Sequence, residues 1–335
     1  MVGVAQLVEP RVVISAVVGS SPIVHPIFRR VGLTVIAAFS FLVLCLLAGC
    51  ATPAPKTPAK LFIAGDSTAA TYQPKEGGNT GKIQQGWGAE LQAFFDPAKL
   101  EVVNAARGGR SSRTFITEGH WDKMLTDVRA GDFVIIQFGH NDAGALNVEP
   151  PESKLPLRAR GTIRGIGNES EEIDNVVTGK HETVYSFGWY LRRMIADTRA
   201  KGATPILMTL TRTNNWTEGR IHCPSDTYRL WDWQTARNEK VALVDLSRII
   251  ADRYQREGVA AVTAQFINDT VHTNVDGARR NAADVTAGLK ALRALPFRKM
   301  LSDAGRELAA DAGAPSGSAC APLGAETKAP ISPSR

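Results

Sequence analysis

Five short apolar runs, rich in Val, Ile, Leu and Phe, alternate with polar or glycine-containing segments along the chain. They lie at residues 61–64, 100–104, 133–138, 205–210 and 241–246. Runs of this length and composition are typical of strands that are buried on both faces of a parallel sheet. We therefore expect five buried strands.

Helical periodicity separates the later runs. Apolar side chains recur every three or four positions over residues 187–198, with charged residues on the opposite face and Gly202 beyond the end. Similar spacing occurs at 249–254 and at 278–292, before Pro296. Because strands and helices alternate, we expect a three-layer α/β/α fold around a mostly parallel sheet. Ligand sites of such sheets lie at the carboxyl ends of the strands.

Two further segments lack this regular pattern. Residues 145–183 are polar, rich in Gly, Glu and Asn, and show little helix or strand periodicity, which is typical of a binding loop. Residues 301–335 contain much Ala, Gly, Pro and Ser, so we expect a disordered tail without a functional role. The catalytic domain should therefore cover residues 61–300.

Residues 1–49 have the pattern of a secretory signal. Arg29 and Arg30 precede a mostly apolar run at 31–47, which is a little short of the about 20 residues that a membrane-spanning helix needs. The run ends in the letters LAGC, which resemble a bacterial lipoprotein signal whose cysteine, Cys50, becomes the lipidated first residue. An uncleaved anchor and ordinary secretion are the alternatives.

The tether and the charge fit an exported protein. Residues 50–60 are rich in Pro and Ala and should extend from a lipid anchor in the cell envelope, on its periplasmic or outer face, to the domain. Without residues 1–49 the formal charge falls from +6 to +4, which permits an acidic polymer as substrate but does not require one. No basic arm indicates nucleic-acid binding.

The cysteines indicate no metal site. Cys45 lies in the apolar leader and Cys50 is the expected lipid site, so only Cys223 and Cys320 remain to form a disulfide. Such a bond would suit an oxidising compartment, but the sequence does not determine it. No Cys/His spacing is typical of zinc, and we expect neither a metal nor a cofactor.

Ser67 is the candidate nucleophile. It follows the first expected strand at a sharp bend, within the letters GDS. A serine in this place also commonly caps a helix or satisfies a turn. The elbow of ordinary α/β-hydrolases is disfavoured because its G-x-S-x-G motif requires glycine where this chain has Ala69.

Later segments supply what a serine nucleophile needs, namely a base, a carboxylate and oxyanion donors. His272 is the best base, and Asp269, three residues earlier, can reach its ring, although capping of the next helix is an alternative role for this carboxylate. Gly109 lacks a Cβ and Asn141 carries an amide, so with the Ser67 N–H they offer three donors. Ordinary turns are the alternative for both.

These four blocks, in this order and each after an expected strand, resemble the SGNH (GDSL) hydrolase superfamily over about residues 60–295. The letters NAARGGRSSRT, QFGHND and DTVHTN are further similar to the rhamnogalacturonan acetylesterase family. The resemblance implies a flavodoxin-like α/β/α fold and ester hydrolysis without a cofactor, by a Ser-His-Asp triad and an acetyl-enzyme intermediate. It implies O-acetylated pectin as substrate. The alternatives are another acyl ester, in xylan, peptidoglycan or lipid, and a carbohydrate-binding lipoprotein without activity.

Five residues are candidates for substrate contacts. Arg107, Arg110 and Arg113 flank the oxyanion glycine, and their guanidinium groups suit galacturonate carboxylates. Surface arginines are more often solvated or paired with acids. Trp87 and Trp216 can stack on sugar rings, with core packing as the alternative.

Overall fold

The computed structural model describes residues 57–73, 83–147, 159–224 and 227–323. The expected leader, the lipid site at Cys50 and the tether up to residue 56 lie outside the described residues. Within the described residues, no helix is both long and apolar enough to cross a bilayer. The folded domain begins with a strand at Ala59, slightly before the expected start.

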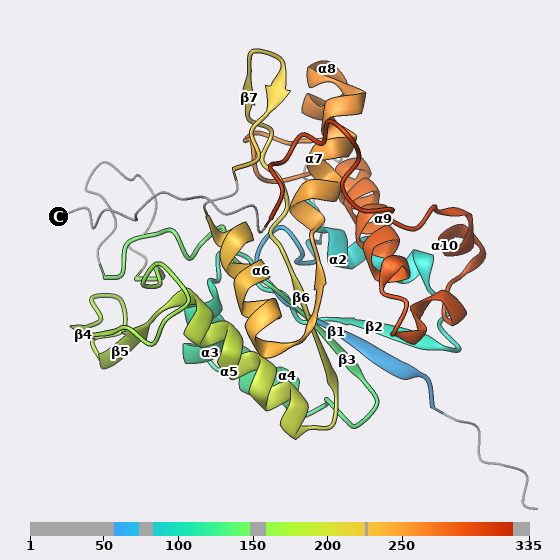
Figure 1. The fold of residues 1–335 in the computed structure, drawn as a ribbon. Coiled ribbons are helices and arrows are strands. Elements are labelled where there is room, and N and C mark those ends of the chain that lie inside the picture. Colours follow the sequence, from blue (N-terminus) through green and yellow to red (C-terminus); the bar gives the residue numbers. More distant parts are fainter. Residues whose placement is uncertain (1–56, 74–82, 148–158, 225–226, 324–335) are drawn as a thin grey trace, which may run out of the picture. The chain divides into compact units, whose positions relative to one another are not determined.

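The centre of the domain is a five-stranded sheet in which all neighbours run parallel (Figure 1). Its strand order is β2-β1-β3-β6-β9. The strands are β1 (Ala59–Gly65), β2 (Leu100–Asn104), β3 (Phe133–Gln137), β6 (Thr204–Met208) and β9 (Ala242–Val244). The predicted α/β fold class and all five predicted strands are confirmed. The last strand is shorter than expected because Asp245 caps the helix that follows it.

Helices cover both faces of the sheet. Strand alternation sends Leu61 and Ile63 to one face, where they pack with residues of α7 (Leu246–Glu257) and α9 (Val275–Ala291). Phe62 on the opposite face packs with α5 (Phe187–Ala200) and α6 (Tyr228–Glu239). The helices α5, α7 and α9 fall where the apolar spacing predicts them. The shorter helices are α2 (Trp87–Glu90), η2 (Leu91–Phe94), α3 (Ser112–Thr117), α4 (His120–Leu125), α8 (Val259–Thr263), η3 (Pro296–Lys299) and α10 (Asp303–Glu307).

In the described part of the chain, two hairpins lie outside the main sheet. The segment 145–183 contains β4 (Ser170–Asp174) and most of β5 (His181–Tyr185), an antiparallel pair where the sequence predicts no regular structure. Only Ile173 of β4 is buried, so the apolar alternation of a half-buried strand is missing from the sequence. A shorter hairpin joins β7 (Trp216–Thr217) and β8 (Arg220–Ile221).

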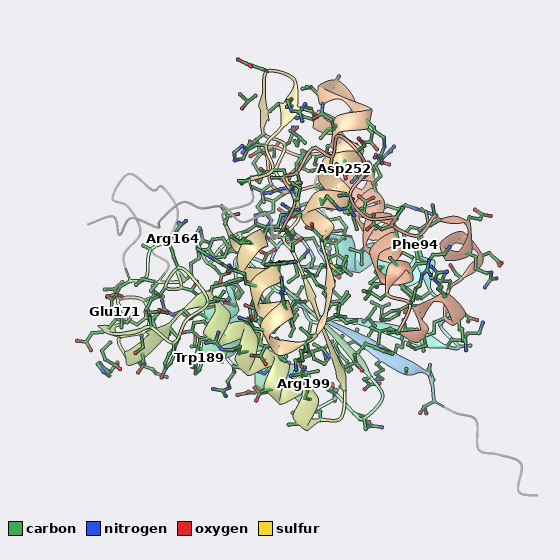
Figure 2. The ribbon with its side chains drawn as sticks, in the orientation of Figure 1. Phe94, Arg164, Glu171, Trp189, Arg199 and Asp252 are labelled. Atoms are coloured by element: carbon green, nitrogen blue, oxygen red, sulfur yellow. A yellow bond between two sulfur atoms is a disulfide. The ribbon has the colours of Figure 1, made fainter. Side chains whose placement is uncertain are left out.

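The prediction of a disordered tail is wrong for residues 301–323. Cys320 forms a disulfide with Cys223, 97 residues earlier in the chain. Asp252 of α7, labelled in Figure 2, accepts hydrogen bonds of 2.8 Å from the Ser318 hydroxyl and the Ala319 N–H. These contacts hold a segment of small residues that has little apolar surface of its own. The domain therefore continues well beyond residue 300.

Candidate active site

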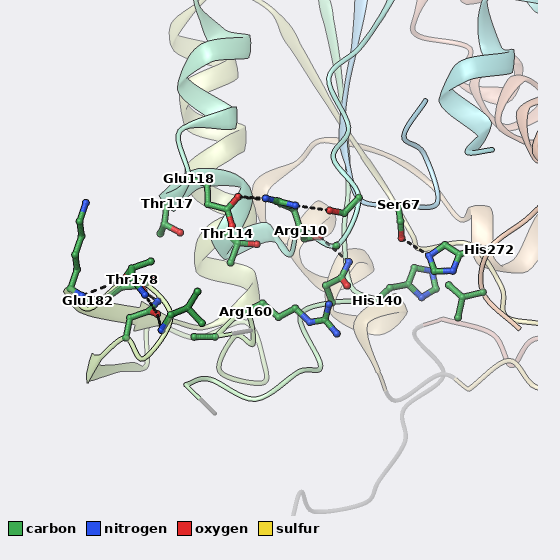
Figure 3. A pocket seen from close by; sticks show the side chains of 18 of the residues that line it. Ser67, Arg110, Thr114, Thr117, Glu118, His140, Arg160, Thr178, Glu182 and His272 are labelled. Carbon is green, nitrogen blue, oxygen red and sulfur yellow. Dashed lines mark hydrogen bonds and ion pairs between the residues drawn. The ribbon is translucent and has the colours of Figure 1, made fainter. Parts of the chain in front are cut away.

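Ser67 lies two residues after the end of β1, at the carboxyl end of the central sheet, and is 8% exposed. The side chain of the preceding Asp66 accepts hydrogen bonds of 2.8 Å from both the N–H and the hydroxyl of Thr68. Asp66 therefore shapes the turn, and the Ser67 hydroxyl is left to face the cavity in Figure 3.

The three candidate catalytic side chains meet at this turn. His272 Nε2 lies 2.9 Å from Ser67 Oγ (Figure 3). On the other side of the ring, His272 Nδ1 lies 2.6 Å from Asp269 Oδ2. The other carboxylate oxygen of Asp269 accepts the backbone N–H groups of Val271 and His272. Asn274, not Asp269, caps the helix that follows. One carboxylate thus folds the loop and also holds the imidazole ring.

The protonation pattern of this relay follows from its hydrogen bonds. Partial burial opposes ionisation of Asp269, but hydrogen bonds from the ring and backbone of His272 and from the Val271 N–H outweigh it and lower the pKa of Asp269. An ionised carboxylate can only accept, so the proton of a neutral imidazole belongs on Nδ1. Nε2 is then free to accept the proton of Ser67.

A short segment before α2 joins the nucleophile turn to the histidine loop. The Gly86 N–H donates to the Ala70 carbonyl at 3.0 Å, and Gln85 exchanges two hydrogen bonds with Thr273, the residue after the histidine. A Cβ at Gly86 would lie only 2.4 Å from the backbone of Ala69, so this close approach requires glycine. The contact explains how segments far apart in sequence reach one site.

The expected oxyanion donors line the same cavity as Ser67. Gly109 has a φ of 76°, which favours glycine, and Asn141 donates one amide hydrogen to the Arg110 carbonyl at 3.0 Å. This bond orients the amide and leaves its second hydrogen available. Within the described ranges, the N–H groups of Ser67 and Gly109 donate to no protein group. They can therefore receive a substrate oxygen.

Asp142 connects the segment that contains Gly109 with the segment that contains Asn141. It accepts hydrogen bonds from the Ser112 hydroxyl at 2.5 Å and from the Gly139 N–H at 3.0 Å. Burial raises the pKa of Asp142 to about 7, against the effect of these hydrogen bonds. The neighbouring His140 bonds Thr211 at 3.0 Å, and burial lowers its pKa, so its ring stays neutral beside the site.

The cavity has a volume of about 1050 Å³. At one end lie Ser67 and His272, and at the other lie Thr178 and Glu182 of the β4–β5 hairpin region (Figure 3). No residue of the hairpin is a candidate from sequence. The only signal for it is the polar, glycine-rich composition of the segment 145–183.

Two predicted substrate contacts are wrong because the side chains are fully buried. Arg113 is 0% exposed and pairs with Glu182 through contacts of 2.7 and 2.8 Å. Trp87 is likewise buried, and its indole N–H donates to Gln137 at 2.8 Å. Neither side chain can reach a sugar, so core packing, the alternative role for Trp87, is correct.

The other candidates for substrate contact have mixed positions. Arg110 lines the cavity, but its guanidinium is paired with Glu118 at 2.8 Å. Arg107 is exposed and is not among the residues that line the cavity. Trp216 packs beside the core, outside the cavity lining, and donates to Asn214 at 2.7 Å. Of the five candidates from sequence, Arg110 alone lines the cavity, and its charge is already compensated.

The arrangement can perform acyl transfer by a serine nucleophile, because the hydroxyl, the imidazole and the oxyanion donors line one cavity and the Asp269 carboxylate holds the imidazole. Over the described part of the chain, no cluster of three or more His, Cys, Asp or Glu side chains could hold a metal ion.

Comparison with known proteins also indicates ester hydrolysis. The GDSL-like Lipase/Acylhydrolase family model matches residues 63–280. A Bacillus subtilis protein named probable rhamnogalacturonan acetylesterase YesY is 31% identical over 237 residues, which cover 69% of this chain and 93% of the relative. The rhamnogalacturonan acetylesterase of Emericella nidulans is 29% identical over 217 residues, which cover 65% of this chain and 79% of the relative.

A solved structure shows the same fold. The crystal structure of the Bacillus subtilis protein YxiM aligns with a TM-score of 0.53 and 26% identity, over 70% of this chain and 56% of that one. The motifs, the site geometry and the match over more than half of the chain agree. The chain therefore belongs to the GDSL-like lipase/acylhydrolase family, the SGNH hydrolases, and is an ester hydrolase.

Proposed function

We propose that this protein is a serine esterase that removes O-acetyl groups from rhamnogalacturonan or a related pectic polysaccharide. The observation that carries the proposal is the continuous relay from Ser67 Oγ through His272 to Asp269, at one end of a cavity much larger than an acetyl group. The choice of polymer is supported by the names of the two acetylesterase relatives.

In the acylation step, Ser67 Oγ attacks the acetyl carbonyl carbon while its proton passes to His272 Nε2. The carbonyl oxygen becomes an oxyanion and is stabilised by the Ser67 and Gly109 N–H groups and the Asn141 amide. His272 then protonates the sugar oxygen as its bond to carbon breaks. The products of this half-reaction are the free sugar hydroxyl and an acetylated Ser67.

In the second step, His272 Nε2 takes a proton from water, whose oxygen attacks the acetyl carbon. The same donors hold the second oxyanion, and the returned proton releases Ser67 as acetate leaves. Asp269 stays ionised throughout, because its hydrogen bonds lower its pKa. Its charge stabilises the imidazolium that forms in each step.

The test compares wild type with Ser67→Ala on 4-nitrophenyl acetate and on acetylated rhamnogalacturonan, homogalacturonan and xylan. We expect acetate release from the pectic polymers and a fall in kcat of roughly 10⁴-fold or more in the variant, with an unchanged circular dichroism spectrum. Unchanged turnover in Ser67→Ala would rule out the serine mechanism. Preference for long acyl chains, or for xylan, would rule out the pectic substrate.

We also propose that the chain is exported and lipidated at Cys50. The leader pattern supports this, as does the disulfide between Cys223 and Cys320, because such bonds persist in oxidising compartments. Labelling of cells with an alkyne fatty acid should mark the wild type but not Cys50→Ser. Equal labelling of the two would contradict lipid attachment at this residue.

A further inference from the structure

The region of the β4–β5 hairpin forms a wall of the cavity. Asn175, Val177, Thr178, Lys180 and Glu182 line the same cavity as the nucleophile. The acetyl group under attack occupies only the nucleophile's end. The cavity of about 1050 Å³ therefore has room for neighbouring sugar residues that extend toward the hairpin.

The hairpin is fixed to the catalytic machinery and is not a loose flap. Glu182 is paired with the buried Arg113, which belongs to α3, directly after the oxyanion segment. Asn175 donates to Glu182 at 2.7 Å and accepts the N–H groups of Val177 and Thr178 at 2.9 and 3.1 Å. These bonds tie the turn between the two strands to α3, the helix that follows the oxyanion segment.

Charges along the cavity are compensated in most places. Arg110 is paired with Glu118, and His181 contacts acidic side chains of the opposite strand. Lys180 differs, because its ammonium forms no ion pair with any residue that the structure describes. Its side chain is exposed, while its carbonyl accepts the Asn175 N–H at 2.9 Å. A backbone held by hydrogen bonds thus presents, among the residues that line the cavity, an ammonium without an ion-pair partner in the described part of the chain.

We propose that Lys180 binds the carboxylate of a uronate sugar in the polymer whose acetyl group lies at Ser67. This inference rests on the proposed function and makes Lys180 a specificity-determining residue. An ammonium is a compact charge that attracts a carboxylate at several ångströms, and a neutral sugar chain gains nothing from it. The same charge would favour pectic polymers over xylan at equal acetylation.

The test measures kcat and KM of wild type, Lys180→Met and Lys180→Arg on three substrates. These are 4-nitrophenyl acetate, acetylated galacturonate oligosaccharides and neutral acetylated xylo-oligosaccharides. Lys201→Met is the matched control, because Lys201 is exposed and lies before the amino end of β6, at the edge of the sheet opposite the site. Both methionine variants remove one charge and keep a similar side-chain length.

We expect Lys180→Met to lower kcat/KM by about five- to tenfold on the uronate substrate, mainly through KM. The two neutral substrates should be unaffected, Lys180→Arg should retain most of the activity, and high salt should bring wild type close to Lys180→Met. Lys201→Met should behave as wild type on all three substrates.

Several outcomes would overturn the inference. An unchanged KM on the uronate substrate in Lys180→Met would do so, and so would an equal loss on all three substrates, which indicates a structural effect. In both cases Ser67-dependent acetate release from pectic polymers would leave the proposed function intact. Absence of acetate release from every pectic substrate in wild type would instead overturn the proposed function and this inference together.

Discussion

Replacement of the buried Arg113 by methionine should destabilise the protein strongly. The guanidinium makes two contacts with Glu182, at 2.7 and 2.8 Å, and also donates to the carbonyls of Leu146 and Gly161 at 2.7 and 2.9 Å. Methionine fills a similar length but provides no donor. The variant therefore removes the guanidinium from two carbonyl groups and from Glu182, which keeps only its hydrogen bond from Asn175.

The size of the effect follows from burial. The Glu182 side chain is only 15% exposed, and removal of one partner of a buried ion pair costs about 3–5 kcal/mol. Burial opposes ionisation of Glu182, but hydrogen bonds from Arg113 and Asn175 outweigh it and lower its pKa. A carboxyl group whose pKa is lowered in the folded state stabilises the fold at pH values above its ordinary pKa. This stabilisation is lost as the pH falls through the lowered pKa. The difference in free energy of unfolding between wild type and Arg113→Met should therefore become smaller at acidic pH.

The assay is urea unfolding followed by circular dichroism at roughly pH 7 and roughly pH 3.5. Arg110→Met is the control, because the Arg110–Glu118 pair is more than a third exposed and such pairs contribute about 1 kcal/mol or less. Arg113→Met/Glu182→Gln should recover part of the loss. A loss in Arg113→Met no larger than in Arg110→Met, or a raised KM with unchanged stability, would refute the structural role.

Three further predictions concern the site and its support. Gly109→Ala should lower kcat on 4-nitrophenyl acetate by about a hundredfold, because its φ of 76° strains other residues and displaces an oxyanion donor; activity near wild type would contradict this. Cys223→Ser should lower the free energy of unfolding, measured by urea titration, by about 2–5 kcal/mol. Dithiothreitol should cause a similar loss in wild type and no further loss in the variant. The raised pKa of Asp142, about 7, means that the folded state takes up a proton before the unfolded state does, so this residue should add stability as pH falls from roughly 8 to 5. Asp142→Asn should lack this gain, and parallel urea-derived stability curves for the two proteins would contradict it.

Much of the fold can be predicted from sequence because the sheet and three main helices bury apolar side chains in regular patterns. The helix α6 cannot be predicted from such a pattern. Its buried positions include Arg229, Asp232 and Thr235, so no apolar stripe marks it. Arg229 is buried because Asp245 compensates it at 2.7 Å, a partner supplied by tertiary structure and not by helical spacing.

One part of the site, the pair of base and carboxylate, is also local in sequence. Asp269 and His272 are three residues apart, so their pairing needs only a turn. The cavity wall is different, because Arg113 and Glu182 are 69 residues apart and nothing near either residue indicates the other. Three similar arginines after β2 therefore look equivalent in sequence. Only the fold distinguishes the buried one from those at the surface.

The order of the catalytic groups along the chain has a consequence for biogenesis. Ser67 and His272 are separated by 205 residues, and the histidine loop leads directly into α9. A growing chain therefore carries its nucleophile and both oxyanion segments long before its base. A chain that ends before residue 269 should lack turnover even if it folds. In refolding experiments, ester cleavage should return only when α9 and the histidine loop before it have packed against the rest of the domain.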